Sequence, residues 1–247
     1  MDFWGITNSG KVRKHNQDVF KMLSNDDEDI AVLVVCDGMG GANAGNIASE
    51  MAADSFVSYI SSRFDEIKEN ISQNEIAEMM TAAVYAANTA VYLKSMQDDE
   101  FEGMGTTLTA AVSTSNGEVV VNIGDSRLYH VANSKITQVT RDHSVVEDMI
   151  EKGEITRNEA RRHPSRNLIT RALGTGYFEP PDVFFLNMES GDSIILCSDG
   201  LSNVVSDNEI QFELLSGTAA RDICESLVDK ALERGAPDNV TAVILRK

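Results

Sequence analysis

The hydrophobic pattern predicts a buried strand near the start of the chain. Residues 30–36 are seven consecutive apolar side chains, rich in Val and Ile, and a Gly-rich turn follows them. A run of this length bounded by glycine is typical of a strand buried on both faces. Weaker alternation predicts earlier strands at 2–8 and 19–23. The acidic stretch 24–29 is expected to form a solvated hairpin tip.

After the Gly-rich turn, the apolar positions recur at helical spacing. They predict an amphipathic helix over about 44–63 and a second one that begins at Ser72, where Ser72 and Glu75 form a capping box. The pattern also predicts a short helix over 207–215. A last helix is expected to end at Gly235.

The second half of the chain alternates in a way that predicts more strands. Residues 104–137 are typical of a β meander with a hairpin turn at Asn116-Gly117. Further strands are expected at 182–188, 193–197 and 239–245. Runs of strands with helices in pairs indicate α+β layers. We find no repeat, linker or domain boundary, and therefore expect a single domain over 1–247.

Between the meander and the next strand, from about 141 to 180, the pattern is mixed. Residues 145–150 suit one or two helical turns, and the basic stretch 157–171 has no clean period. This part of the sequence predicts an irregular, mobile insertion.

Composition and charge narrow the function classes. Of 247 residues, 42% are hydrophobic and 24% charged, as in an ordinary globular protein. The formal net charge is −18, which disfavours nucleic acid or an anionic membrane as a partner because both require a basic face. An anionic substrate is still compatible with this charge if metal ions reverse the local field.

Cysteine usage and the apolar runs bear on location. The three cysteines, with no C-x-x-C pair, argue against a disulfide framework or a zinc site, and each lies in an apolar setting that predicts burial. No apolar run approaches the ~20 residues of a membrane span, and the first residues lack a signal-peptide pattern. We expect a cytoplasmic protein.

Four aspartates occupy similar positions at strand ends. Asp37, Asp125 and Asp199 each end an apolar run beside a small residue, and Asp238 begins the last strand. One such aspartate is usually a turn residue, but four can converge on one edge of a layered fold. Four carboxylates so close together cannot all stay ionised without cations. A set of ligands that are all oxygen atoms favours Mg²⁺ or Mn²⁺. The pattern therefore predicts a two-ion site for a phosphoryl group.

Other sequence features offer rival sites. The Gly-rich loop 38–45 could cradle a nucleotide phosphate, but it lacks the Lys-Ser/Thr of a P-loop, and Asn43 stands where G-x-G-x-x-G needs glycine. Arg13 has the geometry for a phosphate clamp but could equally be a surface residue. The histidines have no ligand spacing and are expected to be structural or exposed: His15, His130, His143 and His163.

Several motifs in one order resemble the metal-dependent protein Ser/Thr phosphatases of the PPM, or type 2C, family in its compact bacterial form. They span nearly the whole chain, and together they are far more specific than any one of them. The motifs are RKHNQD at 13–18, DGMGG at 37–41, MGTTL at 104–108, GDSR at 124–127, RNLITRALG at 166–174, CSDGL at 197–201 and DNVT at 238–241.

The resemblance implies an α+β fold, a four-layer αββα sandwich of two mostly antiparallel sheets flanked by helix pairs. It implies hydrolysis of phosphoserine and phosphothreonine by in-line attack of a water that bridges two metal ions, with no phosphoenzyme. The segment 141–172 would be the flap beside the site. Phosphorylated proteins and a cognate Ser/Thr kinase would be the partners of a monomeric enzyme in bacterial signalling.

The resemblance also implies a role for each matching residue. Asp37 would bridge two Mn²⁺ or Mg²⁺ ions, and the Gly38 carbonyl would bind one of them. Asp199 and Asp238 would complete the other, and Asp125 with Asp199 would hold a third, weaker ion. The resemblance also implies roles for two residues that are not metal ligands. Arg13 would bind the substrate phosphate, and Asp18 would orient water on the metal.

The chain departs from the family pattern at three positions. Met39 and Ala42 stand where many members have histidine, and Gln17 stands where Glu is common. These changes leave the general acid open, for which we favour a metal-bound water, and leave the expected metal ligands intact. Two other functions are compatible with such a site: a silent pseudophosphatase that binds phosphoproteins or a kinase, and a metal-dependent phosphodiesterase or nuclease.

Overall fold

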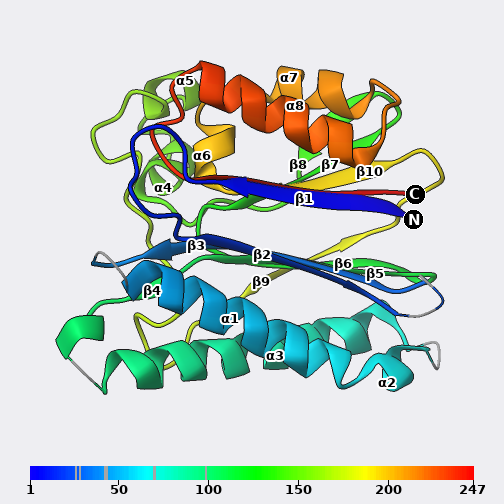
Figure 1. Cartoon of the computed structure of the whole chain (residues 1–247), viewed down its shortest axis with the longest axis horizontal. Coiled ribbons are helices and arrows are strands. Elements are labelled where there is room, and N and C mark those ends of the chain that lie inside the picture. The colour runs from blue at the N-terminus through cyan, green and yellow to red at the C-terminus, as the bar shows by residue number, and fades with distance from the viewer. Residues whose placement is uncertain (26, 28, 42–43, 69–70, 98) are drawn as a thin grey trace.

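The computed structural model describes residues 1–25, 27, 29–41, 44–68, 71–97 and 99–247. Within them the strands form two sheets of antiparallel pairs, covered on their outer faces by helices (Figure 1). The chain therefore has the four-layer α+β sandwich that the family resemblance implied.

The first sheet has the strand order β1-β11-β10-β7-β8. Its strands are β1 (Asp2–Asn8), β7 (Arg127–Ala132), β8 (Lys135–Gln138), β10 (Ser193–Cys197) and β11 (Val240–Arg246). The second sheet has the order β2-β3-β5-β6-β9, with β4 paired to β3. Its strands are β2 (Asp18–Ser24), β3 (Ala31–Met39), β4 (Gly105–Thr106), β5 (Leu108–Thr114), β6 (Gly117–Ile123) and β9 (Asp182–Leu186).

Helices cover the outer face of each sheet. The second sheet is covered by α1 (Ala44–Ser61) and α3 (Gln73–Ser95), with the short α2 (Phe64–Lys68) and 3-10 helix η1 (Asp99–Phe101) near them. The first sheet is covered by α7 (Asp207–Leu214) and α8 (Ala220–Glu233), with α6 (Asp199–Ser202) at its edge. The remaining helices, α4 (Val145–Glu151) and α5 (Arg157–Ala160), lie in the predicted flap.

Strand β3 explains why the apolar run 30–36 is continuous. Val32 and Val34 face α1 and α3, whereas Leu33 and Val35 face the other sheet, and all four are fully buried. Each such side chain contributes about 1.5–3 kcal/mol when it leaves water. The expected burial on both faces is confirmed, and the apolar run fixes β3 at the centre of the sandwich.

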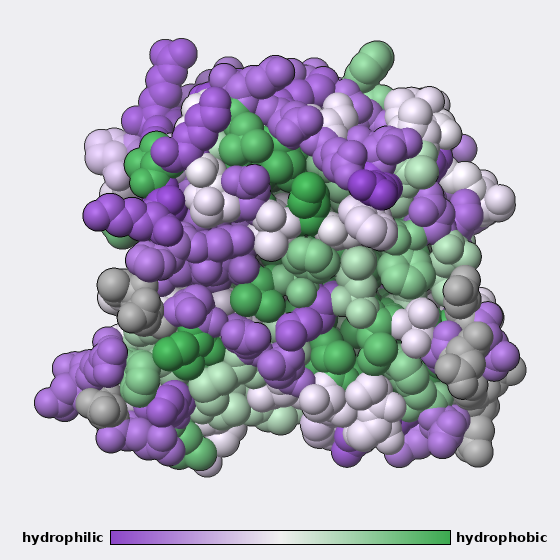
Figure 2. All heavy atoms as spheres, in the orientation of Figure 1, coloured by the Kyte–Doolittle hydropathy of each residue, from purple (hydrophilic) through white to green (hydrophobic). Residues whose placement is uncertain are grey.

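The surface reflects this layering. In Figure 2, apolar side chains gather mainly along the middle of the face, where the layers meet, and hydrophilic side chains cover much of the upper helices. All three cysteines are buried as free thiols, as expected. No helix in the described ranges is long and apolar enough to cross a membrane.

Several sequence predictions are confirmed at element level. The capping box of Ser72 and Glu75 starts α3, and Gly235 follows α8 with a positive φ of 96°. The predicted hairpin turn joins β5 to β6 one residue earlier than expected, at Ser115-Asn116, because Gly117 already pairs with Thr114. Strands β2 and β3 form the expected hairpin, with Ser24 opposite Ala31. Of the predicted acidic tip, Asp26 and Glu28 lie outside the described residues.

The predicted meander over 104–137 is wrong in one respect. Strands β5 and β6 pair within the second sheet, but β7 and β8 belong to the first. The chain crosses between sheets at Gly124, whose φ of 106° is a conformation that glycine adopts without strain. Asp125 therefore lies at the crossing point and not within a hairpin.

Candidate active site

The predicted site residues converge on one edge of the sandwich. A pocket of about 230 Å³ there is lined by residues from both sheets and the flap. Six of the seven residues named from the sequence line it: Arg13, Asp37, Gly38, Asp125, Asp199 and Asp238. The seventh, Asp18, lies opposite Asp37 in the β2–β3 register and is only 4% exposed, so it sits behind the pocket wall.

Asp37 lies inside β3, which corrects the expectation that the strand ends before it. The strand continues to Met39 because Gly38 and Met39 pair with Thr106 and Gly105 of β4. The Asp37 N–H donates to Thr107 Oγ1 at 2.9 Å, and its carbonyl accepts from Thr107 N at 2.9 Å. Thr107 thus holds both the N–H and the carbonyl of Asp37, and the bend of the Gly-rich loop begins only at Gly40, with φ of 141°.

Gly38 is required by close packing. Its N–H donates to the carbonyl of Gln17, and a Cβ at this position would lie 2.1 Å from the carbonyl oxygen of Gly45 in α1. Helix α1 therefore approaches β3 directly behind the pocket. This is a packing reason for glycine here, in addition to the metal-ligand role that the resemblance implied for its carbonyl.

We expect Gly38→Ala to lower stability by about 1–3 kcal/mol, because the added methyl meets backbone atoms that cannot move aside. The melting temperature of the variant should fall by several degrees. Gly41→Ala is the matched control, since its Cβ would meet nothing within 4 Å. Equal melting temperatures for the two variants would show that α1 can shift to accommodate the methyl group.

Asp18 is held by hydroxyl groups from the other sheet. Its Oδ2 accepts hydrogen bonds from Ser198 Oγ and Thr241 Oγ1, both at 2.7 Å. Its Oδ1 is buried and has no hydrogen-bond partner among the described residues. Burial raises the pKa of Asp18 to about 7, and repulsion from Asp199 and Asp238 adds to this while the hydroxyl bonds oppose it.

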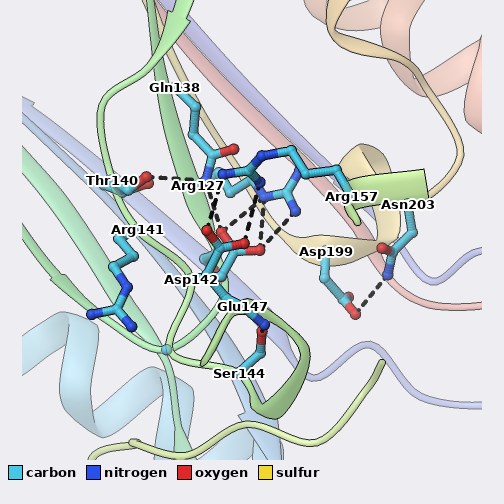
Figure 3. A network of polar contacts seen from close by, with 12 residues as sticks. Arg127, Gln138, Thr140, Arg141, Asp142, Ser144, Glu147, Arg157, Asp199 and Asn203 are labelled. Atoms are coloured by element: carbon cyan, nitrogen blue, oxygen red, sulfur yellow. Dashed lines mark hydrogen bonds and ion pairs between the residues drawn. The ribbon is translucent and has the colours of Figure 1, made fainter. Parts of the chain in front are cut away.

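Asp199 and Asp238 flank the pocket from the first sheet. Asp199 follows β10 as the first residue of α6, and its Oδ2 accepts from Asn203 Nδ2 at 3.0 Å (Figure 3). Asp238 precedes β11, and its Oδ2 accepts from Arg13 Nη2 at 2.8 Å. Among the described residues, no three acidic, His or Cys side chains already form a metal cage. Each carboxylate keeps acceptor sites beside these bonds, through which it could bind a cation.

The electrostatics of the pocket favour positive charge. Burial is the largest cause that raises the pKa values of Asp37, Asp125 and Asp199, and repulsion between neighbouring carboxylates adds to it. The pKa reaches about 8 for Asp125 and about 6 for Asp199, and that of Asp37 is well above its usual range. Divalent cations would relieve this repulsion, and oxygen-only donors with an unpartnered Asp18 Oδ1 fit Mg²⁺ or Mn²⁺.

One ion pair ties the base of the flap to the first sheet, and another joins the two helices of the flap. Arg127 of β7 makes a forked contact with Asp142, and Arg157 of α5 pairs with Glu147 of α4 at 3.0 Å (Figure 3). Backbone bonds of 2.8–2.9 Å join the two ends of the flap, from Thr170 N to His143 O and from Val145 N to Leu168 O. The segment expected to be irregular thus contains two short helices on a fixed base.

Supporting residues of the site were missed by sequence reasoning. Asn239 binds the Arg13 loop, since its Oδ1 accepts from Gln17 N at 2.8 Å and its Nδ2 donates to the carbonyls of Ser9 and His15. Thr107, Ser198 and Thr241 hold Asp37 and Asp18. The motifs MGTTL, CSDGL and DNVT contain all four supporting residues, but no pattern in the sequence says which carboxylate each one contacts.

The Gly-rich loop contributes some of its described residues to the pocket. Gly38 and Gly40 line the same cavity as Asp37, and Gln17 and Met39 also line it. Gln17 packs against the loop, with its Nε2 donating to the Gly41 carbonyl at 3.3 Å. Two positions of the rival nucleotide-loop interpretation, Ala42 and Asn43, lie outside the described residues.

This fold and site define a metal-dependent phosphatase. The carboxylates suit hard divalent ions, and the adjacent guanidinium suits a phosphoryl group. The chain belongs to the protein phosphatase 2C family, whose family model matches residues 10–235.

Known relatives that match nearly the whole chain support this family assignment. The chain is 34% identical to the serine/threonine phosphatase stp of Listeria monocytogenes, covering 98% of this chain and 94% of that protein. It is 34% identical to the protein phosphatase PhpP of Streptococcus pneumoniae, covering 97% and 95%.

Two solved structures are also similar. The structure of Stp1 from Staphylococcus aureus matches with a TM-score of 0.89 and 34% identity, covering 100% of this chain and 95% of that one. The catalytic domain of the phosphatase PstP in complex with two manganese ions matches with a TM-score of 0.83 and 33% identity, covering 98% and 96%.

Proposed function

We propose that this chain hydrolyses phosphoserine and phosphothreonine in proteins, with Mn²⁺ or Mg²⁺ ions held in the pocket. The chain is a protein Ser/Thr phosphatase of the type 2C family. The observation that carries the proposed site is the convergence of Asp37, Asp125, Asp199 and Asp238 beside Arg13 on one edge of the sandwich.

Asp37 is the proposed ligand that two ions would share, and the Gly38 carbonyl would bind one of them. Asp199 and Asp238 would complete the other, and Asp125 with Asp199 would hold a third ion if one binds. When bound, the two central ions supply a water of lowered pKa as the nucleophile. The solved PstP complex with two manganese ions supports a site with two central ions.

Arg13 is the proposed phosphate-binding residue. Its side chain is 56% exposed at the pocket mouth, and it donates to Asp238 through Nη2. A phosphoryl group accepts from a guanidinium in the same forked way as a carboxylate, so substrate can take the place of Asp238 as its partner. Released in this way, Asp238 becomes available to a cation, while Arg13 stabilises the charge that develops on the phosphoryl oxygens.

Asp18 is proposed to act one step away from the reaction. Ser198 and Thr241 fix its Oδ2, and the free Oδ1 can then accept a hydrogen bond from water held in the pocket. Such supporting hydrogen bonds orient water and ligands without direct contact with the substrate.

The remaining assignments follow from the chemistry of the class. Its substrates are phosphorylated proteins, and we propose a cognate Ser/Thr kinase among them and an action that opposes kinases in bacterial signalling. We also propose that the chain acts as a monomer in the cytoplasm. Neither rival function gains support: the four aspartates that a pseudophosphatase would lose are all present, and a net charge of −18 disfavours a nuclease.

The proposal is tested by comparing hydrolysis of a phosphothreonine peptide, p-nitrophenyl phosphate and a phosphate bis-ester, with Mn²⁺ and with a chelator. A phosphatase releases phosphate from the first two only with the metal present. Cleavage of the bis-ester alone, which yields an alcohol and a phosphate monoester, would instead identify a phosphodiesterase. Retention of the peptide without any release would identify a pseudophosphatase.

We expect Asp18→Asn to weaken the response to metal by about 10–100-fold, the usual cost of losing a supporting contact behind metal ligands. The measurement is the Mn²⁺ concentration that gives half-maximal activity, which a purely structural role would leave unchanged. Asp229→Asn on the exposed face of α8 is the matched control. An unchanged metal response together with a lowered melting temperature would reduce Asp18 to a packing role.

A further inference from the structure

A second groove leads away from the active-site pocket. It has a volume of about 390 Å³ and runs between the flap and the segment from α6 to the start of α7. Arg13, Asn167, Asp199 and Asp238 line both cavities, so the groove opens directly from the site. A chain that extends from a residue bound in the pocket could therefore continue into the groove.

Arginines from four parts of the chain line this groove: Arg13, Arg127, Arg161, Arg166 and Arg234. Three of them are paired with carboxylates. Arg127 contacts Asp142, Arg234 contacts Glu209, and Arg13 contacts Asp238.

The other two arginines of the groove are not paired in this way. Arg161 and Arg166 are exposed on the flap and have no carboxylate within 4.0 Å among the described residues. Arg166 Nη1 donates to the carbonyl of Arg161 at 3.3 Å, which keeps the two residues together. The groove is therefore lined by two flap arginines that have no carboxylate partner among the described residues.

The excess of basic side chains in the groove contrasts with the acidic composition of the chain as a whole. The chain has 21 basic and 39 acidic residues. The carboxylates of the groove are Asp199, Asp238 and Glu209, of which Glu209 is neutralised by Arg234. The two aspartates belong to the proposed ion site, where cations would offset them. A guanidinium binds phosphoryl or carboxylate oxygens in a forked geometry, so this wall of the groove is suited to an anion.

We propose that Arg161 and Arg166 form a second anion-binding site, which binds a phosphoryl or carboxylate group a few residues from the phosphoresidue in the same substrate chain. This inference rests on the proposed function, and it names the substrate class: protein segments that carry two phosphates or an acidic flank. Such segments are favoured because the pocket and the groove are filled by one continuous chain.

The test compares phosphothreonine peptides whose flanks are neutral, acidic, doubly phosphorylated or basic, on either side of the phosphothreonine. We expect kcat/KM to be about tenfold higher for the acidic and doubly phosphorylated peptides than for the neutral one, mainly through KM. The comparison between carboxylate and phosphoryl flanks shows which anion is preferred. The preference should shrink as salt is raised, because the guanidiniums are exposed.

The double variant Arg161→Ala/Arg166→Ala should lose this preference and keep its hydrolysis of p-nitrophenyl phosphate, which does not extend into the groove. Arg162→Ala is the matched control, since Arg162 is an exposed flap arginine that does not line the groove. A preference that survives in the double variant, or that is absent from the wild type, overturns the inference while the proposed function stands.

Failure of the proposed function gives a different result. In that case none of the phosphothreonine peptides and no p-nitrophenyl phosphate is hydrolysed by the wild type. The groove is then judged by fluorescence anisotropy of the labelled acidic peptide. Binding that is weakened about tenfold in the double variant supports the site, and equal binding to both proteins refutes it.

Discussion

Replacing Asp37 by alanine is expected to reduce Mn²⁺-dependent phosphate release by about 10³-fold or more, since loss of a single stabilising donor can cost 10²–10³-fold and Asp37 is proposed to hold two ions. Its backbone bonds to Thr107 do not involve the carboxylate, so the strand should survive the change. The measurement is the rate of phosphate release from a phosphothreonine peptide over a range of Mn²⁺ concentrations.

The control for this variant is Asp229→Ala, the same substitution on the exposed face of α8. It should leave both the rate and the metal response unchanged. If Asp37→Ala retained the full rate at the same Mn²⁺ concentration, Asp37 could not be the shared ligand and the site assignment would fail.

The stability of the metal-depleted protein is expected to fall as pH rises from about 5 to about 8. The pKa values of Asp18, Asp125 and Asp199 are raised to about 7, 8 and 6, above those of an unfolded chain. Groups with raised pKa values stabilise the fold while protonated, and this contribution is lost as pH passes through the folded pKa. At low pH the carboxylates are neutral, and at high pH they repel one another.

Bound Mg²⁺ should reverse this loss. A ligand at 100 times its Kd stabilises by about 2.7 kcal/mol, which corresponds to a rise in melting temperature on the order of 5–10 °C for a domain of this size. Melting temperatures are measured in chelator and in Mg²⁺ at both pH values. Asp125→Asn should flatten the pH dependence in chelator by removing one of the charges. A melting temperature in chelator that does not change with pH would contradict the predicted repulsion.

Local signals in the sequence were sufficient for most elements. The apolar run of β3 and the capping box of α3 are decided by residues close in sequence, and both were predicted within a few positions. The extension of β3 through Met39 depends on β4, more than sixty residues away, so no local pattern could reveal it. The change of sheet at Gly124 is likewise a tertiary event, since the strands on either side look alike.

The candidate site likewise contains residues that local sequence patterns reveal and residues that only the fold brings into contact. The residues that line the pocket were found because strand-end aspartates and the family motifs are visible in the sequence. The residues that hold them were missed because each contact joins distant segments, as between Ser198 and Asp18 across the two sheets. The free arginines of the groove were equally hidden, because only the structure separates Arg161 and Arg166 from arginines that have carboxylate partners.

The pairing of β1 with β11 has a practical consequence for protein engineering. Asp2 lies opposite Arg246, and the two chain ends emerge side by side, on the side of the molecule opposite α4 and α5 (Figure 1). A short linker could therefore close the chain into a ring, with new ends opened in a surface turn such as that between β5 and β6. For the same reason, a fluorescent or affinity module fused at either end would project away from the flap.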